Sequence, residues 1–212
     1  VAVFAQTPLI ISEYVEGSSN NKAVELYNNS TSIVNLSDFV LFQFNNGATT
    51  SSGTRFALTF TNPTYLAPGR TYVIVNTAAG TALKAYANLQ TSNSALNFNG
   101  DDALAIFRSS DVSGTTINNN SPIDILGQIG LDPGTEWGTG IISTADNTIR
   151  RKVSTYSGVT TNPSPFTPAT EYDGFATDAF DGLGYHNMGG SITTNTSLPA
   201  RAYTDLTING SG

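Results

Sequence analysis

Short β-prone runs separated by turn-forming residues recur along most of the chain. The first two, residues 9–14 and 22–27, combine apolar and charged positions and flank a polar loop at residues 17–21. Glycine and asparagine favour turns there because they tolerate positive φ. Further strands are predicted at intervals of roughly 8 to 15 residues, which is typical of a β-sandwich or barrel: residues 39–44, 56–60, 71–76, 103–107, 123–129, 147–152 and 205–208.

One short helix is predicted within this β pattern. Residues 81–89 place Leu83, Tyr86 and Leu89 three apart, as one face of a helix would. From about residue 133 glycine, proline and acidic residues become denser, which indicates long loops over one end of the sandwich. No polar linker divides the chain, so we expect residues 9–212 to form one domain, preceded by an apolar segment at residues 1–8.

Composition narrows the classes of function. There is no cysteine, which excludes disulfides, thiolate metal sites and cysteine nucleophiles. The net charge is −7 and the one tight basic cluster is residues 150–152, so direct binding to nucleic acid is not expected. No apolar run reaches the roughly 18 residues that a membrane span needs. An acidic chain with few lysines fits an extracellular protein, and also Ca²⁺ binding through oxygen ligands.

The start of the chain reads like the end of a signal peptide. Val3 and Ala5 occupy the −3 and −1 positions of a cleavage site after Ala5. Either cleavage falls earlier, or the apolar head remains in the mature protein. A retained head could pair as an edge strand of its own domain. Alternatively, Val1, Val3 and Phe4 could add a strand to the sheet of the next copy.

Carboxylates are the strongest candidate functional groups. The metal-ligand candidates, for Ca²⁺, are Asp101, Asp102, Asp173, Asp178 and Asp181. Their glycine-rich loops could supply oxygen ligands, although the spacing is not that of an EF-hand. The plainer interpretation, which we favour, is that these acids cap turns and pair with arginines and Lys152. In the first hairpin, Lys22 is expected to pair across the strands with Glu13 or Glu25.

Single aromatic and imidazole side chains suggest further roles. His186, the one histidine, could act as a base or a ligand, but a loop histidine packed on aromatic neighbours is the simpler interpretation. No G-x-S-x-G nucleophile motif accompanies it. Trp137 could stack on a sugar, or anchor a loop. Several Asn-x-Ser/Thr sequons occur, and in an asparagine-rich chain some arise by chance, so the glycosylation state is left open.

Four motifs resemble the lamin-tail domains found on secreted bacterial proteins. They are ISEYVEGSSNNKAVELYN with VNLSDFVL, then NGDDALAIF, then DILGQIGLDPGTEWG with STADNTIRRK, and finally EYDGFATDAFDGLGYH. In this order they cover most of residues 8–186. The resemblance implies an all-β, immunoglobulin-like β-sandwich. It also implies a non-catalytic module of the kind attached to nucleases, phosphatases or surface proteins.

Two functional hypotheses follow. The first is a secreted, non-enzymatic structural or interaction module, whose partners are other protein subunits, including further copies that would form surface filaments by strand addition. The second is an accessory or metal-dependent catalytic part of a secreted nuclease or phosphoesterase. The second would use Asp101, Asp102, Asp178, Asp181 and His186.

Overall fold

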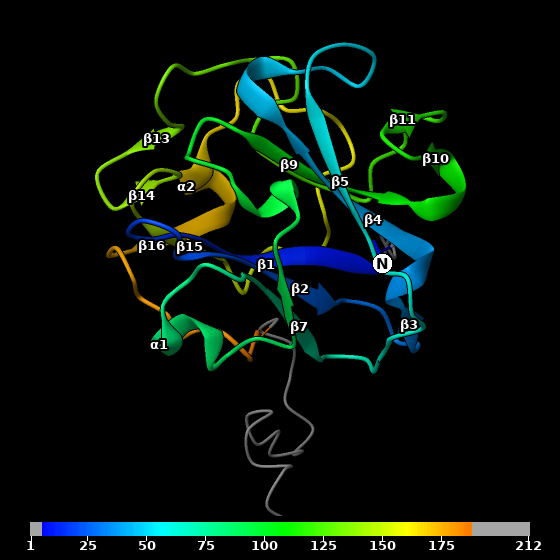
Figure 1. Ribbon diagram of the computed structural model, residues 1–212, viewed down its shortest axis with the longest axis horizontal. Coiled ribbons are helices and arrows are strands. Elements are labelled where there is room, and N and C mark those ends of the chain that lie inside the picture. Colours follow the sequence, from blue (N-terminus) through cyan, green and yellow to red (C-terminus); the bar gives the residue numbers. More distant parts are fainter. Residues whose placement is uncertain (1–5, 188–212) are drawn as a thin grey trace, which may run out of the picture.

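Two antiparallel-rich sheets pack face to face in the computed structural model, which describes residues 6–187 (Figure 1). The larger sheet has six strands in the order β16-β15-β1-β2-β7-β8, and the smaller has four in the order β12-β9-β4-β5. The larger sheet is built from β1 (Leu9–Glu16), β2 (Lys22–Asn28), β7 (Thr71–Asn76), β8 (Leu89–Thr91), β15 (Thr148–Arg151) and β16 (Tyr172–Phe175). The smaller is built from β4 (Phe39–Phe44), β5 (Arg55–Thr59), β9 (Ala103–Arg108) and β12 (Asp124–Leu126).

The remaining elements are short. Three two-stranded pairs join β3 (Val34–Asn35) to β6 (Tyr65–Leu66), β10 (Val112–Ser113) to β11 (Thr116–Ile117), and β13 (Gly138–Thr139) to β14 (Ile142–Ser143). The helices are α1 (Thr81–Lys84) and α2 (Pro168–Glu171), with four 3₁₀ turns: η1 (Leu36–Asp38), η2 (Asn45–Gly47), η3 (Ser94–Leu96) and η4 (Ser109–Asp111). The expectation of at most one short helix is therefore wrong: Pro168 starts a second helical turn, a position that its fixed φ favours.

The core lies between the sheets and is rich in aromatic and branched side chains. The rings of Phe42 and Phe107, both on the smaller sheet, pack edge to face with their centroids 5.6 Å apart. The ring of Tyr14, on the larger sheet, lies 4.6 Å from that of Phe98 between centroids. All of these rings are buried. Two sheets packed over such a core confirm the predicted all-β, immunoglobulin-like sandwich.

Strand prediction was accurate where apolar runs are bounded by turns. The ranges 39–44 and 71–76 coincide with β4 and β7. The predicted helix over 81–89 ends after Lys84, and Leu89 begins β8, which pairs parallel to β7. The run 123–129 forms a strand only over Asp124–Leu126 because Gly127, at φ +97°, turns the chain away. The predicted strand over 205–208 and the segment at 1–5 lie outside the described residues.

The stretch after residue 133 contains more regular structure than predicted. Besides β15 it contributes β16, which extends the larger sheet, and the β13–β14 hairpin that covers the β16 edge. Gly174 of β16 lies so close to the Ile141 carbonyl that a side chain would overlap it. Within residues 6–187, no helix has the length and apolarity needed to cross a membrane.

Candidate functional site

Asp101 and Asp102 lie at the start of β9 and are held by neighbouring polar groups. The Asn46 backbone N–H and the Gln43 side-chain amide donate to the two carboxylate oxygens of Asp102, at 2.9 and 2.5 Å. Burial raises the pKa of both aspartates, and the charge of Asp102 adds to the effect on Asp101. The Asp102 carboxylate therefore holds the turn at the end of β4, as the turn-capping interpretation expects.

Asp178 and Asp181 lie elsewhere, in the segment that follows β16. Asp178 accepts hydrogen bonds from the Ser18 N–H at 3.0 Å and from the Asn21 amide at 3.0 Å, and it thereby ties this segment to the first hairpin loop. Burial by itself would raise the pKa of Asp178, but these hydrogen bonds outweigh it and lower the pKa below its usual value. Asp181 pairs with Arg150 at 2.5 Å, and Asp173 is an exposed residue of β16.

The five predicted calcium ligands therefore do not form one site. Within residues 6–187, no three histidine, cysteine, aspartate or glutamate side chains are arranged to hold a metal ion. Nor does the fold join Asp101 and Asp102 to the other proposed catalytic groups, since Asp178 and Asp181 contact the first hairpin and β15 instead. A role for Ca²⁺ stays a prediction without a shared coordination site.

The two singular aromatic candidates are structural. Trp137 is 5% exposed and packs edge to face on Phe166 at 5.8 Å, so it anchors a loop and offers no face to a sugar. The ring of His186 lies 4.9 Å from that of Tyr27, and burial lowers its pKa to about 4. A neutral imidazole of this kind packs against its neighbour, as the simpler interpretation predicted.

Sequence reasoning missed the most completely buried ion pair. Asp124 and Arg151 lie 2.8 Å apart with no side-chain exposure and join the two sheets at β12 and β15. Asp124 also accepts the Ile11 and Val159 backbone N–H groups, both at 2.8 Å. The available signal was the alternation in β15, which turns Arg150 to one face and Arg151 to the other. The sequence places both arginines in one basic cluster and does not indicate that Arg151 is buried.

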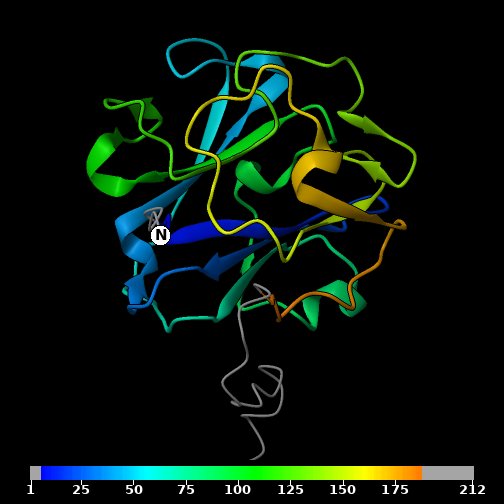
Figure 2. The ribbon, with the colours of Figure 1, turned by 180° about the vertical axis from the view of Figure 1, so that it is seen from behind.

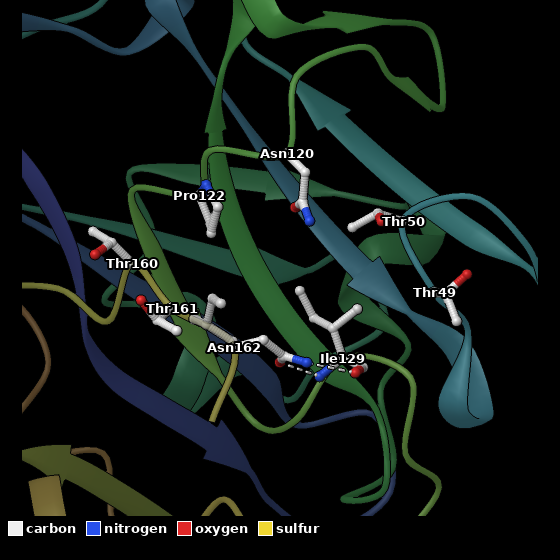
Figure 3. A pocket seen from close by; sticks show the side chains of 9 residues that line it. Thr49, Thr50, Asn120, Pro122, Ile129, Thr160, Thr161 and Asn162 are labelled. Carbon is white, nitrogen blue, oxygen red and sulfur yellow. Dashed lines mark hydrogen bonds between the residues drawn. The ribbon is translucent and has the colours of Figure 1, made fainter. Parts of the chain in front are cut away.

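A hollow of about 410 Å³ opens beside β12 (Figure 3). Its floor is apolar, with Pro122 and Ile129, and the uncharged Thr50 and Asn120 side chains stand around it. The Asn162 amide clamps the backbone of Ile129 on both sides: it accepts from the N–H and donates to the carbonyl, each at 2.8 Å. No ionisable side chain lines the hollow, so it offers contacts for binding and no acid, base or nucleophile for catalysis.

The fold and these contacts define an immunoglobulin-like β-sandwich in which Lys22, Arg150 and Arg151 pair with carboxylates of the same chain. The family model described as Lamin Tail Domain matches residues 2–129, more than half of the 212-residue chain, and the chain belongs to that family. The family is a non-catalytic one, so the match is compatible with a protein that is not an enzyme. Among curated proteins none matches.

A solved structure supports the same fold. The crystal structure of a DUF4876 family protein from Bacteroides thetaiotaomicron shares 16% sequence identity, with a TM-score of 0.53. The alignment covers 87% of this chain and 75% of that one. At this identity the likeness concerns the fold alone.

Proposed function

We propose that this protein is a non-enzymatic, extracellular interaction module that associates with further protein subunits, including copies of itself. The observation that carries the proposal is that its buried and half-buried cations and its histidine are engaged in contacts within the chain. Arg151, Arg150 and Lys22 are each paired with carboxylates of the same chain, and the sole histidine is packed on Tyr27. These cations are engaged within the fold, and what remains for a partner is main chain, uncharged side chains and exposed acids such as Asp38 and Asp132.

One sheet edge has the geometry to accept an added strand. β5 is the outer strand of the smaller sheet (Figure 1). Its Ala57 carbonyl accepts a hydrogen bond from the Asn93 amide at 3.0 Å, so it points away from β4. In an antiparallel ladder alternate residues face the same way, so the backbone groups of Arg55 and Thr59 also face outward. An extended segment could pair along this edge.

The donor in this proposal is the apolar head with Val1, Val3 and Phe4, whose structure lies outside the described residues. Strand addition between copies of one chain is head to tail, and it propagates into an open filament unless the rotation closes a ring. Such an assembly would suit a cell-surface fibre and requires no catalytic group.

Electron microscopy of the purified protein, with and without a calcium chelator, tests the proposal. We expect filaments or oligomers that disappear on deletion of residues 1–5. They should also disappear in Ala57→Pro, which removes an outward-facing N–H that no ladder bond needs. Thr81→Pro, at the exposed first residue of α1 where proline is tolerated, is the matched control and should still assemble. Discrete monomers under every condition would refute self-association, and loss of filaments on chelation would place Ca²⁺ at an interface.

A further inference from the structure

The last described segment, residues 176–187, crosses the outer face of the larger sheet, away from the main core; we call it the C-terminal strap. In Figures 1 and 2 it is the orange end of the ribbon, which runs from β16 toward α1. Leu183 is 5% exposed and belongs to a second apolar cluster on this face, with Val15, Ala23, Val73, Val75, Ala79 and Leu83. The strap therefore covers a sheet face that would otherwise be open.

A row of charges lies beneath the strap. In the register of the sheet Glu13 of β1 stands opposite Glu25 of β2 on one side and Arg150 of β15 on the other, so all three side chains share one face. Glu13 is 2% exposed and Glu25 is fully buried. The Arg150 Nε lies 3.1 Å from the Glu13 carboxylate. Two buried carboxyl groups thus share one guanidinium.

The strap completes the bonding of this row. The Gly184 N–H donates to Glu25 Oε2 at 2.6 Å, and Arg150 Nη2 donates to the Ala179 carbonyl at 3.2 Å and to Asp181 at 2.5 Å. The guanidinium of Arg150 therefore contacts both the strap, at Ala179 and Asp181, and the sheet, at Glu13. Gly182 approaches the Arg150 and Glu13 side chains so closely that a Cβ would overlap both.

We propose that the C-terminal strap is a proton-controlled cover, closed while the Glu13–Glu25 pair carries a proton and released when both carboxylates are ionised. With both ionised, a second negative charge would lie in a buried site that holds a single guanidinium, and like charges at close range without water are strongly unfavourable. Release of the strap hydrates the pair and uncovers the apolar cluster beside it.

The direction of the pH dependence follows from the carboxyl groups. Burial raises the pKa of Glu13 to about 8, Glu25 adds to the shift, and Arg150 opposes it. Burial likewise raises the pKa of Glu25 to about 7, against the hydrogen bonds from Ser12 and Gly184. The closed state binds protons that the open state has released, so closure weakens as the pH rises from the ordinary glutamate value of 4.5 toward 8.

Other groups on the strap act in the opposite direction at lower pH. Burial lowers the pKa of His186 from its ordinary value of 6.5 to about 4. Below pH 6.5 the imidazole therefore takes up a proton when the strap opens, and this uptake offsets one of the two protons that the carboxyl groups release. Asp178 and Asp181 have lowered pKa values and hold the strap only while ionised. Closure is accordingly strongest at mildly acidic pH and weakens as the pH rises toward 8. The surrounding elements carry further ionisable side chains, among them Glu16, Lys22, Tyr27, Asp146, Arg151, Asp173 and Tyr185.

Amide hydrogen exchange of the intact chain from pH 5 to 9, corrected for intrinsic exchange rates, tests the proposal. We expect the opening constant of the strap amides, Gly184 included, to rise at least tenfold between pH 5 and 8, since each linked proton contributes up to tenfold per pH unit. Glu25→Gln keeps the shape of the side chain and should leave the strap protected up to pH 9. Gly182→Ala should expose it at every pH. Glu136→Gln, away from the strap, is the matched control and should behave as the wild type.

Exchange of the β7 amides in the same samples reports whether each variant is folded, so a loss confined to the strap is distinguished from unfolding. Strap protection independent of pH in the wild-type protein would overturn the proposal. A pH-dependent loss that persists unchanged in Glu25→Gln would overturn it as well.

Discussion

Removal of the Asp124 carboxylate should cost more stability than almost any other single polar truncation in the protein. Asp124→Ala leaves the fully buried guanidinium of Arg151 with only the longer, 3.4 Å contact to the partly exposed Glu171 as counter-charge. It also removes the acceptor of the Ile11, Ile125 and Val159 N–H groups, which lie 2.8, 3.0 and 2.8 Å from the carboxylate. Breaking a buried pair from one side costs about 3–5 kcal/mol. A domain has about 5–15 kcal/mol in total, so most of the stability could be lost.

Urea unfolding followed by fluorescence and circular dichroism measures this loss as a shift of the midpoint at constant slope. Asp181→Ala is the matched control, because it also removes an aspartate that pairs with an arginine, but its side chain is 83% exposed. An exposed pair contributes roughly 0–1 kcal/mol. The double replacement Asp124→Leu with Arg151→Met should cost less than the Asp124→Leu single variant, since the buried guanidinium is then removed together with its buried partner. The carboxylate that remains, Glu171, has 23% side-chain exposure and can be hydrated.

The reasoning fails if Asp124→Ala is no more destabilising than Asp181→Ala. It also fails if the effects of Asp124→Leu and Arg151→Met simply add up in the double variant, because a coupled pair must show an interaction energy.

Three further predictions concern stability. Gly174→Ala should lower the free energy of unfolding by about 1–3 kcal/mol in urea titrations, because its Cβ would overlap the Ile141 carbonyl. Asn162→Ala should cost about 1–2 kcal/mol by the same assay and release the Ile129 backbone in hydrogen exchange, because it deletes both clamping bonds. The pKa of Glu25 is raised to about 7, so the free energy of unfolding should fall between pH 5 and 8. Calorimetry at both pH values should show this decline, and it should be smaller in Glu25→Gln. An equal decline in the variant would contradict the assignment.

The strand pattern could be predicted because it depends on local chemistry. Residues 39–44 are mostly apolar and β-prone, and the turn that follows them contains Asn46 and Gly47, both of which adopt positive φ. The pattern thus contains both the strand and its stop signal. The β16 strand, residues 172–175, was missed because its residues include Asp173 and Gly174, which disfavour strands, and pairing with β15 overrides that preference.

Charge partners were harder to predict because they depend on register and on distant chain segments. We expected Lys22 to pair with Glu13 or Glu25, but it pairs with Glu16, its direct neighbour across the hairpin. A bulge between Ile11 and Glu13 shifts the register of β1 by one residue, so the alternation in the sequence does not continue through the strand. The partner of Glu13 is Arg150, which no pattern near residue 13 can indicate.

The placement of these charges bears on how the domain can bind. The structure uses Asp124 and Arg151 to join its sheets, and Glu13, Glu25 and Arg150 to hold the strap. These five side chains are engaged within the fold, and the surface charge that a partner could meet is that of exposed residues such as Asp38 and Asp132. Main-chain hydrogen bonding at a sheet edge and contacts to threonine and asparagine around the hollow need no charge, and both suit a protein with only 12% charged residues. The low charge is thus consistent with the extended-segment association that we propose. For that reason the Ala57→Pro edge variant is a more informative test of function than any aspartate substitution.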